Sequence, residues 1–517
     1  MQLTQALTRA VQIHPRKVGT ICGDRSRTWG EIGDRVARLG AALRALEVKP
    51  GDRVAVLALN SDRYIELFFA INWAGAAIVP LNIRWAIPEN VYALKDCEPS
   101  ALIYDDEYAE AVAQLQQQHP VRCLIYMGDK AAPNGHQDYE ALIRSTAPME
   151  NACGAKDELA FICYTGGTTG FPKGVMLSHT NVVYGLLNWI ASYHHSDETV
   201  FLHASAYCHL AGAWPAMAVT MTGGRHVVLP KFQAETAFAA IEKHRVNHCL
   251  FVPTMINLLV HHPDFEKYDL SSVKDCIYGA SPISDAVQTA VLAKLPTWKF
   301  IQGYGMTETS AVSLTMPWRY HFDGEDHKSK RLGTGRAAFG VDIRIVDAQG
   351  KELPRGETGE IAIHGPQVML GYWRNPEATA ATIRDGWLFS GDAAWMDEDG
   401  FAYIVDRKKD MIISGGENVY SREVENAVSL HPAVLECAVI GIPDEKWGEA
   451  VHAVIVQKKG HRASAEDIIE HCHKWIAGYK CPRSVEFRDA MPVSTQGKLQ
   501  KNLLRDPYWQ GQRRAVT

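Results

Sequence analysis

A loop rich in glycine and threonine, at residues 163–174, constrains this chain more than any other stretch. The apolar residues 159–163 that precede it are typical of a buried strand. Glycines without a Cβ let successive backbone N–H groups converge on one oxyanion, and threonine hydroxyls and a lysine ammonium add donors and charge. The chain is therefore predicted to run from a strand into a polyphosphate-binding loop. Its candidate residues are Thr165, Gly166, Gly167, Thr168, Thr169 and Lys173.

The spacing of this loop differs from that of the best-known phosphate loop, which has a Gly-Lys pair followed directly by a hydroxyl residue. Here two residues separate Gly170 from Lys173, and Gly174 follows the lysine. The loop is therefore not of the Walker type. A plain surface turn is the alternative interpretation, but such a turn has no need of the lysine.

Alternating helix and strand patterns surround the loop. Thr28 and Glu31 have the spacing of a capping box, and residues 32–46 then repeat apolar side chains at helical spacing. Apolar segments at 54–59 and 76–81 flank a second helical pattern, and the alternation recurs after residue 200. This order predicts an α/β fold with a parallel, doubly wound sheet.

The pattern changes after about residue 340, where short strands and turns predict a β-rich subdomain. The charged block 406–410 then separates apolar segments and is interpreted as a hinge, with a solvated turn as the alternative. The helix and strand patterns beyond it make a unit of domain size. We therefore expect a large N-terminal domain at 1–406 and a small C-terminal α+β domain at 407–517.

Charge and cysteine usage narrow the possible partners and location. The net charge of -6 argues against a general nucleic-acid binder, because phosphate backbones require a basic surface. The 11 cysteines form no Cys-x-x-Cys pair and no secretory leader is evident, so a cytoplasmic location is expected. The apolar stretch 67–81 is too short to span a bilayer, although a peripheral membrane contact stays open. The oligomeric state, monomer or homodimer, is also open.

A second candidate site follows another strand pattern, at residues 302–309. Thr307 and Glu308 place a hydroxyl and a carboxylate at the end of that strand, where open α/β sheets bind ligands. Such a carboxylate suits Mg²⁺, which is usually bound by one or two carboxylates and substrate phosphates. An isolated Thr-Glu pair would mean little, but the order Tyr304-Gly-x-Thr-Glu at this distance from the first loop is specific.

Three further segments are candidate nucleotide contacts only when they are taken together with the two motifs above. The small residues 279–281 end a strand pattern and would let a flat base lie against the backbone. Asp392 provides a carboxylate that is able to accept both ribose hydroxyls. Lys498 lies in a polar Gly-Lys turn near the C-terminus, which taken alone is a common feature.

Together these motifs closely resemble those of the adenylate-forming superfamily, which comprises acyl-CoA synthetases, firefly luciferases and peptide-synthetase adenylation domains. The resemblance covers nearly the full length, although Gly166 stands where the family usually has serine. It implies that Thr307 contacts the α-phosphate and that Glu308 holds the magnesium ion. Lys498 would lie between the substrate carboxylate and the α-phosphate. The C-terminal domain would be mobile, with its hinge at Lys409.

The resemblance also implies the remaining contacts. Tyr304 would pack against adenine, and Arg407 would reach the ribose together with Asp392. His209 takes a position beside the acyl carboxylate, although a histidine at a strand end is more often structural. The other implied contacts are Gly279, Ala280 and Ser281 beside adenine, and Gly415, Gly416 and Glu417 along a pantetheine tunnel.

The implied activity is that of an AMP-forming acyl-CoA synthetase, which activates a carboxylic acid with MgATP and transfers the acyl group to coenzyme A. ATP, Mg²⁺ and CoA are therefore expected. A medium- or long-chain fatty acid is the expected substrate, and residues 211–216 would begin its apolar pocket wall. An aromatic or cinnamic-type acid is the alternative, and loading of a carrier protein is a further one. A luciferase-like oxygenase shares every motif, whereas a dinucleotide-binding oxidoreductase would need a Gly-x-Gly-x-x-Gly motif that the first strand lacks.

Overall fold

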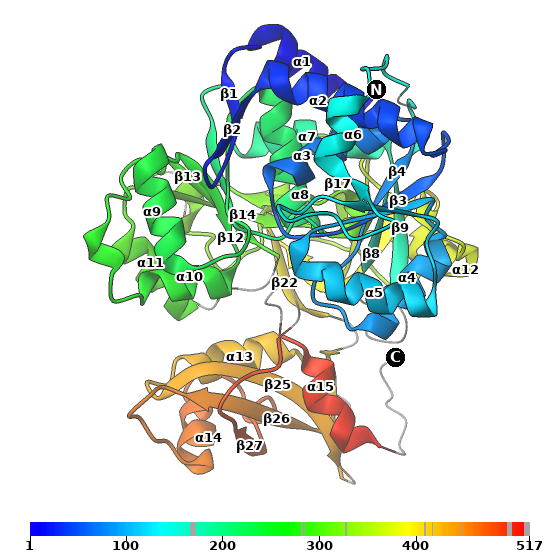
Figure 1. Cartoon of the computed structure of the whole chain (residues 1–517). Helices are drawn as coiled ribbons and strands as arrows, with labels where there is room; N and C mark the ends of the chain where they lie inside the picture. Colours follow the sequence, from blue (N-terminus) through cyan, green and yellow to red (C-terminus); the bar gives the residue numbers. More distant parts are fainter. Residues whose placement is uncertain are drawn as a thin grey trace.

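The structure is a computed structural model of the 517-residue chain. It describes residues 1–152, 154–165, 172–280, 283, 285–325, 328–407, 410–415, 417–444, 446–493 and 499–510. In these residues the strands form four sheets, two large and two small (Figure 1). The expected α/β fold, with a β-rich part and a small C-terminal α+β part, is confirmed.

The first large sheet has eight strands in the order β19-β9-β8-β4-β3-β5-β6-β7. Strands β8, β4, β3, β5, β6 and β7 are parallel, whereas β9 and β19 add antiparallel at one edge. The strands are β3 (Arg53–Leu57), β4 (Ala77–Pro80), β5 (Ala101–Tyr104), β6 (Cys123–Tyr126), β7 (Gln137–Asp138), β8 (Leu159–Thr165), β9 (Lys173–Ser178) and β19 (Gly371–Tyr372).

The second large sheet has nine strands in the order β16-β15-β14-β13-β12-β10-β11-β1-β2. It is parallel from β14 to β1 and antiparallel at both edges. The strands are β1 (Val18–Cys22), β2 (Arg25–Thr28), β10 (Val200–His203), β11 (Arg225–Val228), β12 (His248–Phe251), β13 (Asp275–Gly279), β14 (Lys299–Tyr304), β15 (Leu314–Met316) and β16 (Arg336–Ala337).

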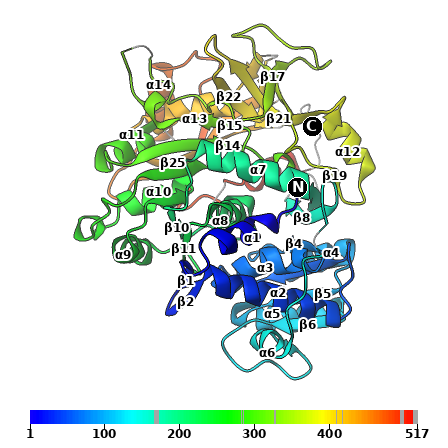
Figure 2. The same ribbon diagram turned by 90° about the horizontal axis from the view of Figure 1, so that it is seen from above.

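Helices pack between and around these two sheets (Figures 1 and 2). They are α1 (Gln5–Ile13), α2 (Trp29–Ala45), α3 (Asp62–Trp73), α4 (Ile87–Cys97), α5 (Ala109–Gln118), α6 (Tyr139–Ser145), α7 (His179–Ser192), α8 (Leu210–Thr222), α9 (Ala234–His244), α10 (Pro253–Val260) and α11 (Asp285–Lys294). Helix α2 begins at the expected capping box, in which Thr28 and Glu31 bond reciprocally. Helices α3 and α8 are buried nearly all round because they share one core with strands of both sheets.

A smaller sheet follows in the order β17-β18-β21-β20, with β22 paired to β21. Its strands are antiparallel and carry the short helix α12 (Pro376–Thr382) at one end. The strands are β17 (Asp342–Val346), β18 (Gly359–His364), β20 (Ile383–Arg384), β21 (Trp387–Met396) and β22 (Ala402–Arg407). The expected boundary between 406 and 407 falls at the end of β22 and stays a prediction.

The remaining strands form a C-terminal sheet with helices on both faces, which lies below the rest of the chain in Figure 1. The helices are α13 (Ser421–Ser429), α14 (Ala465–His473) and α15 (Lys501–Arg505). The strands are β23 (Ile412–Ser414), β24 (Glu417–Val419), β25 (Val434–Asp444), β26 (Gly448–Gln457) and β27 (Ser484–Phe487). Alternate residues of β25 and β26 face the two helix layers, as the period of a strand requires.

Among the described residues, no helix is both long and apolar enough to cross a membrane.

Candidate active site

The two strands that flank the expected phosphate loop form an antiparallel hairpin. Thr165 ends β8 and Lys173 begins β9, and the two are register partners. The Thr165 hydroxyl donates to the backbone carbonyl of Lys173 at 3.4 Å. Residues 166–171, which include Gly166, Gly167, Thr168 and Thr169, lie outside the described residues. The connection therefore leaves the sheet at the carboxyl end of β8, the edge at which parallel α/β sheets bind ligands.

The second motif lies where it was predicted, directly after β14. Thr307 and Glu308 form a single 3₁₀ turn with Thr309, and both are half-buried. The backbone carbonyl of Glu308 accepts a hydrogen bond from the N–H of Met369 at 2.8 Å. Because Met369 precedes β19, this bond ties the turn to the edge of the first large sheet.

Tyr372 connects the two motifs and was missed by the sequence analysis. Its hydroxyl donates to a carboxylate oxygen of Glu308 at 2.9 Å, and its ring lies 4.9 Å from the Lys173 ammonium. Tyr372 reaches this position because β19 pairs with β9, which begins at Lys173. Burial, together with the charge of Glu308, raises the pKa of Tyr372, so the phenol stays protonated and acts as the donor.

Two glycines bring the backbones of β13 and β14 close together at their carboxyl ends. Gly279 and Gly303 are register partners, and a Cβ on Gly279 would lie 2.1 Å from the Gly303 carbonyl oxygen. Ala280 follows with φ of +63°, in the left-handed region, and is exposed. Ser281 lies outside the described residues. Gly279, Ala280 and Gly303 themselves carry no side chain larger than a methyl group, which suits the close approach of a planar base.

The residues expected at adenine and at ribose contact each other. The Tyr304 hydroxyl donates to the Asp392 carboxylate at 2.6 Å, and Asp392 is only 7% exposed. Asp392 is also the register partner of Arg407 across β21 and β22. The backbone thus brings Tyr304, Asp392 and Arg407 to one place. The side chain of Arg407 is not among the described parts of the structure.

His209 is the residue before α8, not a residue at the end of a strand. Strand β10 ends at His203, and the carbonyl of His209 accepts the N–H groups of Gly212 and Ala213, each at 2.9 Å. A Cβ at Gly212 would lie 2.3 Å from the Ala206 carbonyl oxygen, so this tight turn requires glycine. The half-buried His209 therefore directly precedes the helix that was expected to form the acyl pocket wall.

The remaining predicted residues belong to the C-terminal part. Gly415 and Glu417 are exposed at the β23–β24 hairpin, and the N–H of Gly415 donates to the Trp447 carbonyl at 2.8 Å. Gly415 has φ of +64°, where glycine is favoured. Gly416, Lys498 and the hinge residue Lys409 lie outside the described residues, so their positions stay predictions.

The residues present fit a magnesium nucleotide. One half-buried carboxylate, Glu308, lies near a lysine and a hydroxyl donor, which is the sparse protein donor set that Mg²⁺ uses beside substrate phosphates. Within the described part of the chain, no three His, Cys, Asp or Glu side chains gather as a complete metal cage.

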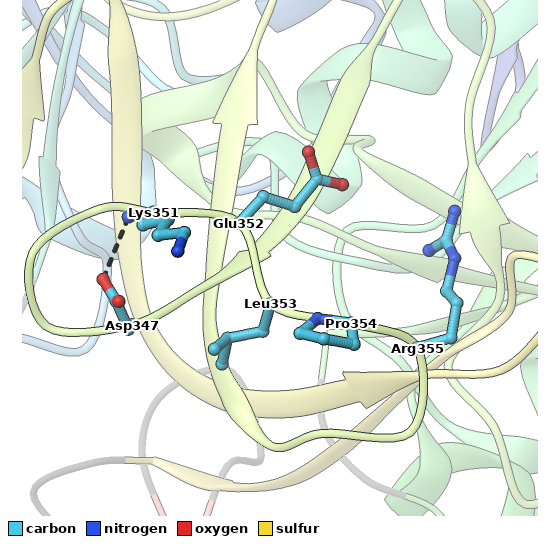
Figure 3. Close-up of a pocket in the computed structure, with 6 residues that line it drawn as sticks. All are labelled: Asp347, Lys351, Glu352, Leu353, Pro354 and Arg355. Atoms are coloured by element: carbon cyan, nitrogen blue, oxygen red, sulfur yellow. Dashed lines mark hydrogen bonds between the residues drawn. The ribbon is translucent and has the colours of Figure 1, made fainter.

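A surface pocket lies elsewhere, in the segment between β17 and β18 (Figure 3). It is lined by Asp347, Lys351, Glu352, Leu353, Pro354 and Arg355, none of which is a predicted site residue. The Asp347 carboxylate accepts the N–H of Lys351 at 2.9 Å, as in an ordinary turn. This pocket is therefore separate from the candidate site.

Comparisons with known proteins identify the family of this chain. The family model described as AMP-binding enzyme matches residues 7–373, and that of the AMP-binding enzyme C-terminal domain matches residues 423–498. The chain is 38% identical to a feruloyl-CoA synthase of an Amycolatopsis species, over 96% of this chain and 97% of that protein. It is 33% identical to the fatty acid–[acyl-carrier-protein] ligase ScoC of Streptomyces coeruleorubidus, over 99% and 98%. The crystal structure of ATP-bound MatB from Rhodopseudomonas palustris is similar with a TM-score of 0.88 and 30% identity, over 98% and 99% of the two chains.

Proposed function

This chain belongs to the AMP-binding enzyme family, is an AMP-forming acid–thiol ligase and, we propose, activates an acid that carries an oxygenated aromatic ring. ATP and CoA are its other substrates, and Mg²⁺ is its metal ion. The sequence favoured a fatty acid and kept the aromatic acid as the alternative. Two observations now favour the alternative.

The first observation is the pattern of relatives. The feruloyl-CoA synthase is 38% identical and the ScoC ligase 33%, with nearly full coverage in both cases. Feruloyl is a methoxy- and hydroxy-substituted aromatic acyl group. This difference in identity supports an aromatic acid, and it does not by itself assign one.

The second observation is a buried phenol, and the proposal depends mainly on it. Tyr193 is fully buried at the end of α7, and a Cβ on Gly303 would lie 2.2 Å from its hydroxyl oxygen. Within the described part of the chain, neither this hydroxyl nor the indole N–H of Trp214 on α8 has a hydrogen-bond partner. A buried donor without a partner costs about 1–3 kcal/mol. The alkyl chain of a fatty acid would leave these donors without a partner, so the cost would remain. A hydroxyl or methoxy oxygen on an aromatic acid would accept a hydrogen bond from one of them.

The first chemical step joins the acid to AMP. A carboxylate oxygen of the acid attacks the α-phosphorus of ATP, the bond from that phosphorus to the bridging oxygen breaks, and pyrophosphate leaves. Lys173 and the Thr165 hydroxyl would hold the departing phosphates, and Thr307 would hold the α-phosphate. Magnesium, held by Glu308, would supply positive charge against the phosphates. Lys498 would offset the repulsion between the two anions as they approach.

The second step releases AMP. The sulfur of CoA, after its thiol proton passes to solvent, attacks the acyl carbon of the adenylate. The bond from that carbon to the phosphate oxygen breaks, and AMP leaves with the electron pair. Gly415, Gly416 and Glu417 would line the path of the pantetheine arm. His209 would lie beside the acyl group at the start of α8.

A medium- or long-chain fatty acid is the second candidate. It is favoured by the small apolar residues that precede and follow Trp214 on α8 and by the relative ScoC, which is named for fatty acids and a carrier protein. With either acid a carrier protein is the alternative to CoA as acceptor, because both present the same pantetheine arm.

A substrate panel tests the proposal. Purified enzyme with MgATP and CoA is offered ferulic, 4-hydroxycinnamic, cinnamic, octanoic and hexadecanoic acids, and AMP release is measured. We expect the highest kcat/KM for the oxygenated cinnamic acids. Highest values for octanoic or hexadecanoic acid would replace the aromatic proposal by the second candidate. Replacing CoA by a carrier protein that bears a free pantetheine thiol distinguishes the two acceptors.

A further inference from the structure

The residues that flank the expected catalytic lysine are paired with each other. Val493 and Leu499 form an antiparallel bridge, and the N–H of Gln500 donates to the carbonyl of Pro492 at 2.8 Å. Residues 494–498 lie between these pairs, outside the described residues. The chain then continues directly into α15, which begins at Lys501. Whatever fixes α15 therefore also fixes one end of the segment that carries Lys498.

Helix α15 has only five residues, too short to hold a direction by itself. It is anchored at three points instead. Leu504 is buried in the C-terminal core beside Ile440 and Val454. Lys501 and Arg505, one helical turn apart, each form an ion pair with another element.

The contacts of Lys501 lead from α15 across to β22. Its ammonium contacts the Glu425 carboxylate at 2.7 Å and donates to the hydroxyl of Ser421, both on α13. That hydroxyl and the backbone N–H of Ser421 donate in turn to Asp406, at 2.7 and 2.6 Å. Asp406 lies at the end of β22, before the proposed hinge. The Lys501 side chain is 14% exposed and that of Glu425 is 18% exposed.

Arg505 contacts the other side of the proposed hinge. Its guanidinium pairs with Asp410 at 2.8 Å, and both side chains are largely buried. Burial by itself lowers the pKa of Lys501, but attraction by Glu425, Asp406 and Asp410 outweighs it and the pKa is raised. Lys501 is therefore charged at neutral pH.

We propose that Lys501 is a positioning residue for the first half-reaction: it fixes α15 against α13 and so sets where Lys498 is held. Three residues of chain reach about 10 Å at most, so a shift of Lys501 is transmitted to Lys498 with little slack. This inference rests on the proposed role of Lys498 in adenylate formation. It does not concern the second step, in which the proposed mechanism gives Lys498 no part.

The test separates the two half-reactions in the full-length enzyme. Lys501→Met keeps the apolar stem and removes the charge. Acid-dependent exchange of pyrophosphate into ATP is expected to fall by roughly tenfold to a hundredfold, the effect of a small misplacement of a catalytic group. Conversion of supplied acyl-AMP and CoA to acyl-CoA is expected to stay near the wild-type rate. Equal losses in both assays, or no loss in either, would overturn the inference.

A control ion pair also involves helix α13. Lys480 contacts Glu423 at 2.7 Å, two positions before Glu425, but it is not connected to the segment of Lys498. Lys480→Met should leave pyrophosphate exchange near wild type. Lys501→Arg keeps the charge and should restore most of the exchange. If Lys480→Met lowers exchange as much as Lys501→Met, any loss of an ion pair on α13 suffices and the inference fails.

A second variant covers the case in which Lys501→Met does not fold because Glu425 is left buried and unpaired. The double variant Lys501→Met with Glu425→Gln removes both charges, and it should fold, convert supplied acyl-AMP and still lose exchange. Wild-type exchange by this variant would overturn the inference. If the wild-type enzyme itself shows no acid-dependent exchange, the proposed function fails first, so the two failures are distinguishable.

Discussion

The Tyr304 hydroxyl donates a 2.6 Å hydrogen bond to the Asp392 carboxylate, across 88 positions of sequence. Tyr304 ends strand β14 of the second large sheet, and Asp392 lies on β21 of the smaller sheet. A nucleotide in this site would thus have its base and its sugar beside two side chains that already fix each other. Such preorganisation lowers the cost of ordering the site when the ligand binds.

Tyr304→Phe should therefore weaken ATP binding without affecting the acid. The ring stays, but the Asp392 carboxylate loses the donor that orients it. A hydrogen bond to a charged group contributes about 1.5–3 kcal/mol, so the KM for ATP should rise roughly tenfold or more. Steady-state kinetics with each substrate varied in turn check this. A rise in the KM of the acid alone would instead assign Tyr304 to the acyl group.

Tyr372→Phe should weaken the response to magnesium. This variant removes the 2.9 Å bond to Glu308 and keeps the ring beneath Lys173. A net loss of about 1 kcal/mol predicts a shift of roughly fivefold in the magnesium concentration that gives half-maximal activity. Titration of activity with Mg²⁺ at fixed ATP measures it. An unchanged titration curve would contradict the role given to this hydroxyl.

Tyr193→Phe should change substrate preference. If the buried hydroxyl binds an oxygen of the acid, kcat/KM for 4-hydroxycinnamic or ferulic acid should fall by roughly fivefold, while that for cinnamic acid should barely change. The free enzyme should lose no stability, because the hydroxyl has no partner within the described residues. Equal effects on substituted and unsubstituted acids would remove the main support for the aromatic proposal.

His226 should make the fold sensitive to acid. Burial lowers the pKa of His226 to about 3, and the imidazole packs against His203, Thr220 and the ring of Trp29. The unfolded state has a histidine pKa of about 6.5, so between these values only the unfolded state takes up the proton. The stabilising contribution is complete above about pH 6.5 and is lost as the pH falls toward 3.

The measurement is the free energy of unfolding by denaturant at pH 7, 6 and 5. His226→Asn should reduce the slope of this free energy with pH by up to about 1.4 kcal/mol per pH unit. His179 and His248, whose pKa values burial lowers to about 4, act in the same direction and should leave a residual slope. A slope that His226→Asn does not change would contradict this assignment.

Local patterns predicted much of the fold because their causes are local. The Thr28–Glu31 capping box marks the start of α2, and the Thr307–Glu308 pair does follow the end of a strand. Each depends on neighbours a few positions away, which periodicity and turn chemistry reveal.

The contacts of Tyr372 could not be predicted in this way. Strand β19 has only two residues, and its partner β9 lies about two hundred positions earlier, so no periodic signal reveals the pairing. The position of His209 in the fold was missed for a different reason: β10 is only four residues long, and the chain turns before it reaches His209, the residue before α8. Long-range register and strand length are set by packing of the two sheets, which no local segment encodes.

We propose that distant segments of the chain, Lys498 among them, together make a carboxylate attack ATP. The most direct measurement is the exchange of labelled pyrophosphate into ATP by the wild-type enzyme and by Lys498→Ala, with supplied acyl-AMP and CoA as the parallel assay. We expect wild-type exchange that requires both the acid and Mg²⁺, a loss of about a hundredfold or more in Lys498→Ala, and thioester formation from acyl-AMP in both proteins. Exchange that is absent from the wild type with every acid, or that Lys498→Ala retains in full, would contradict it.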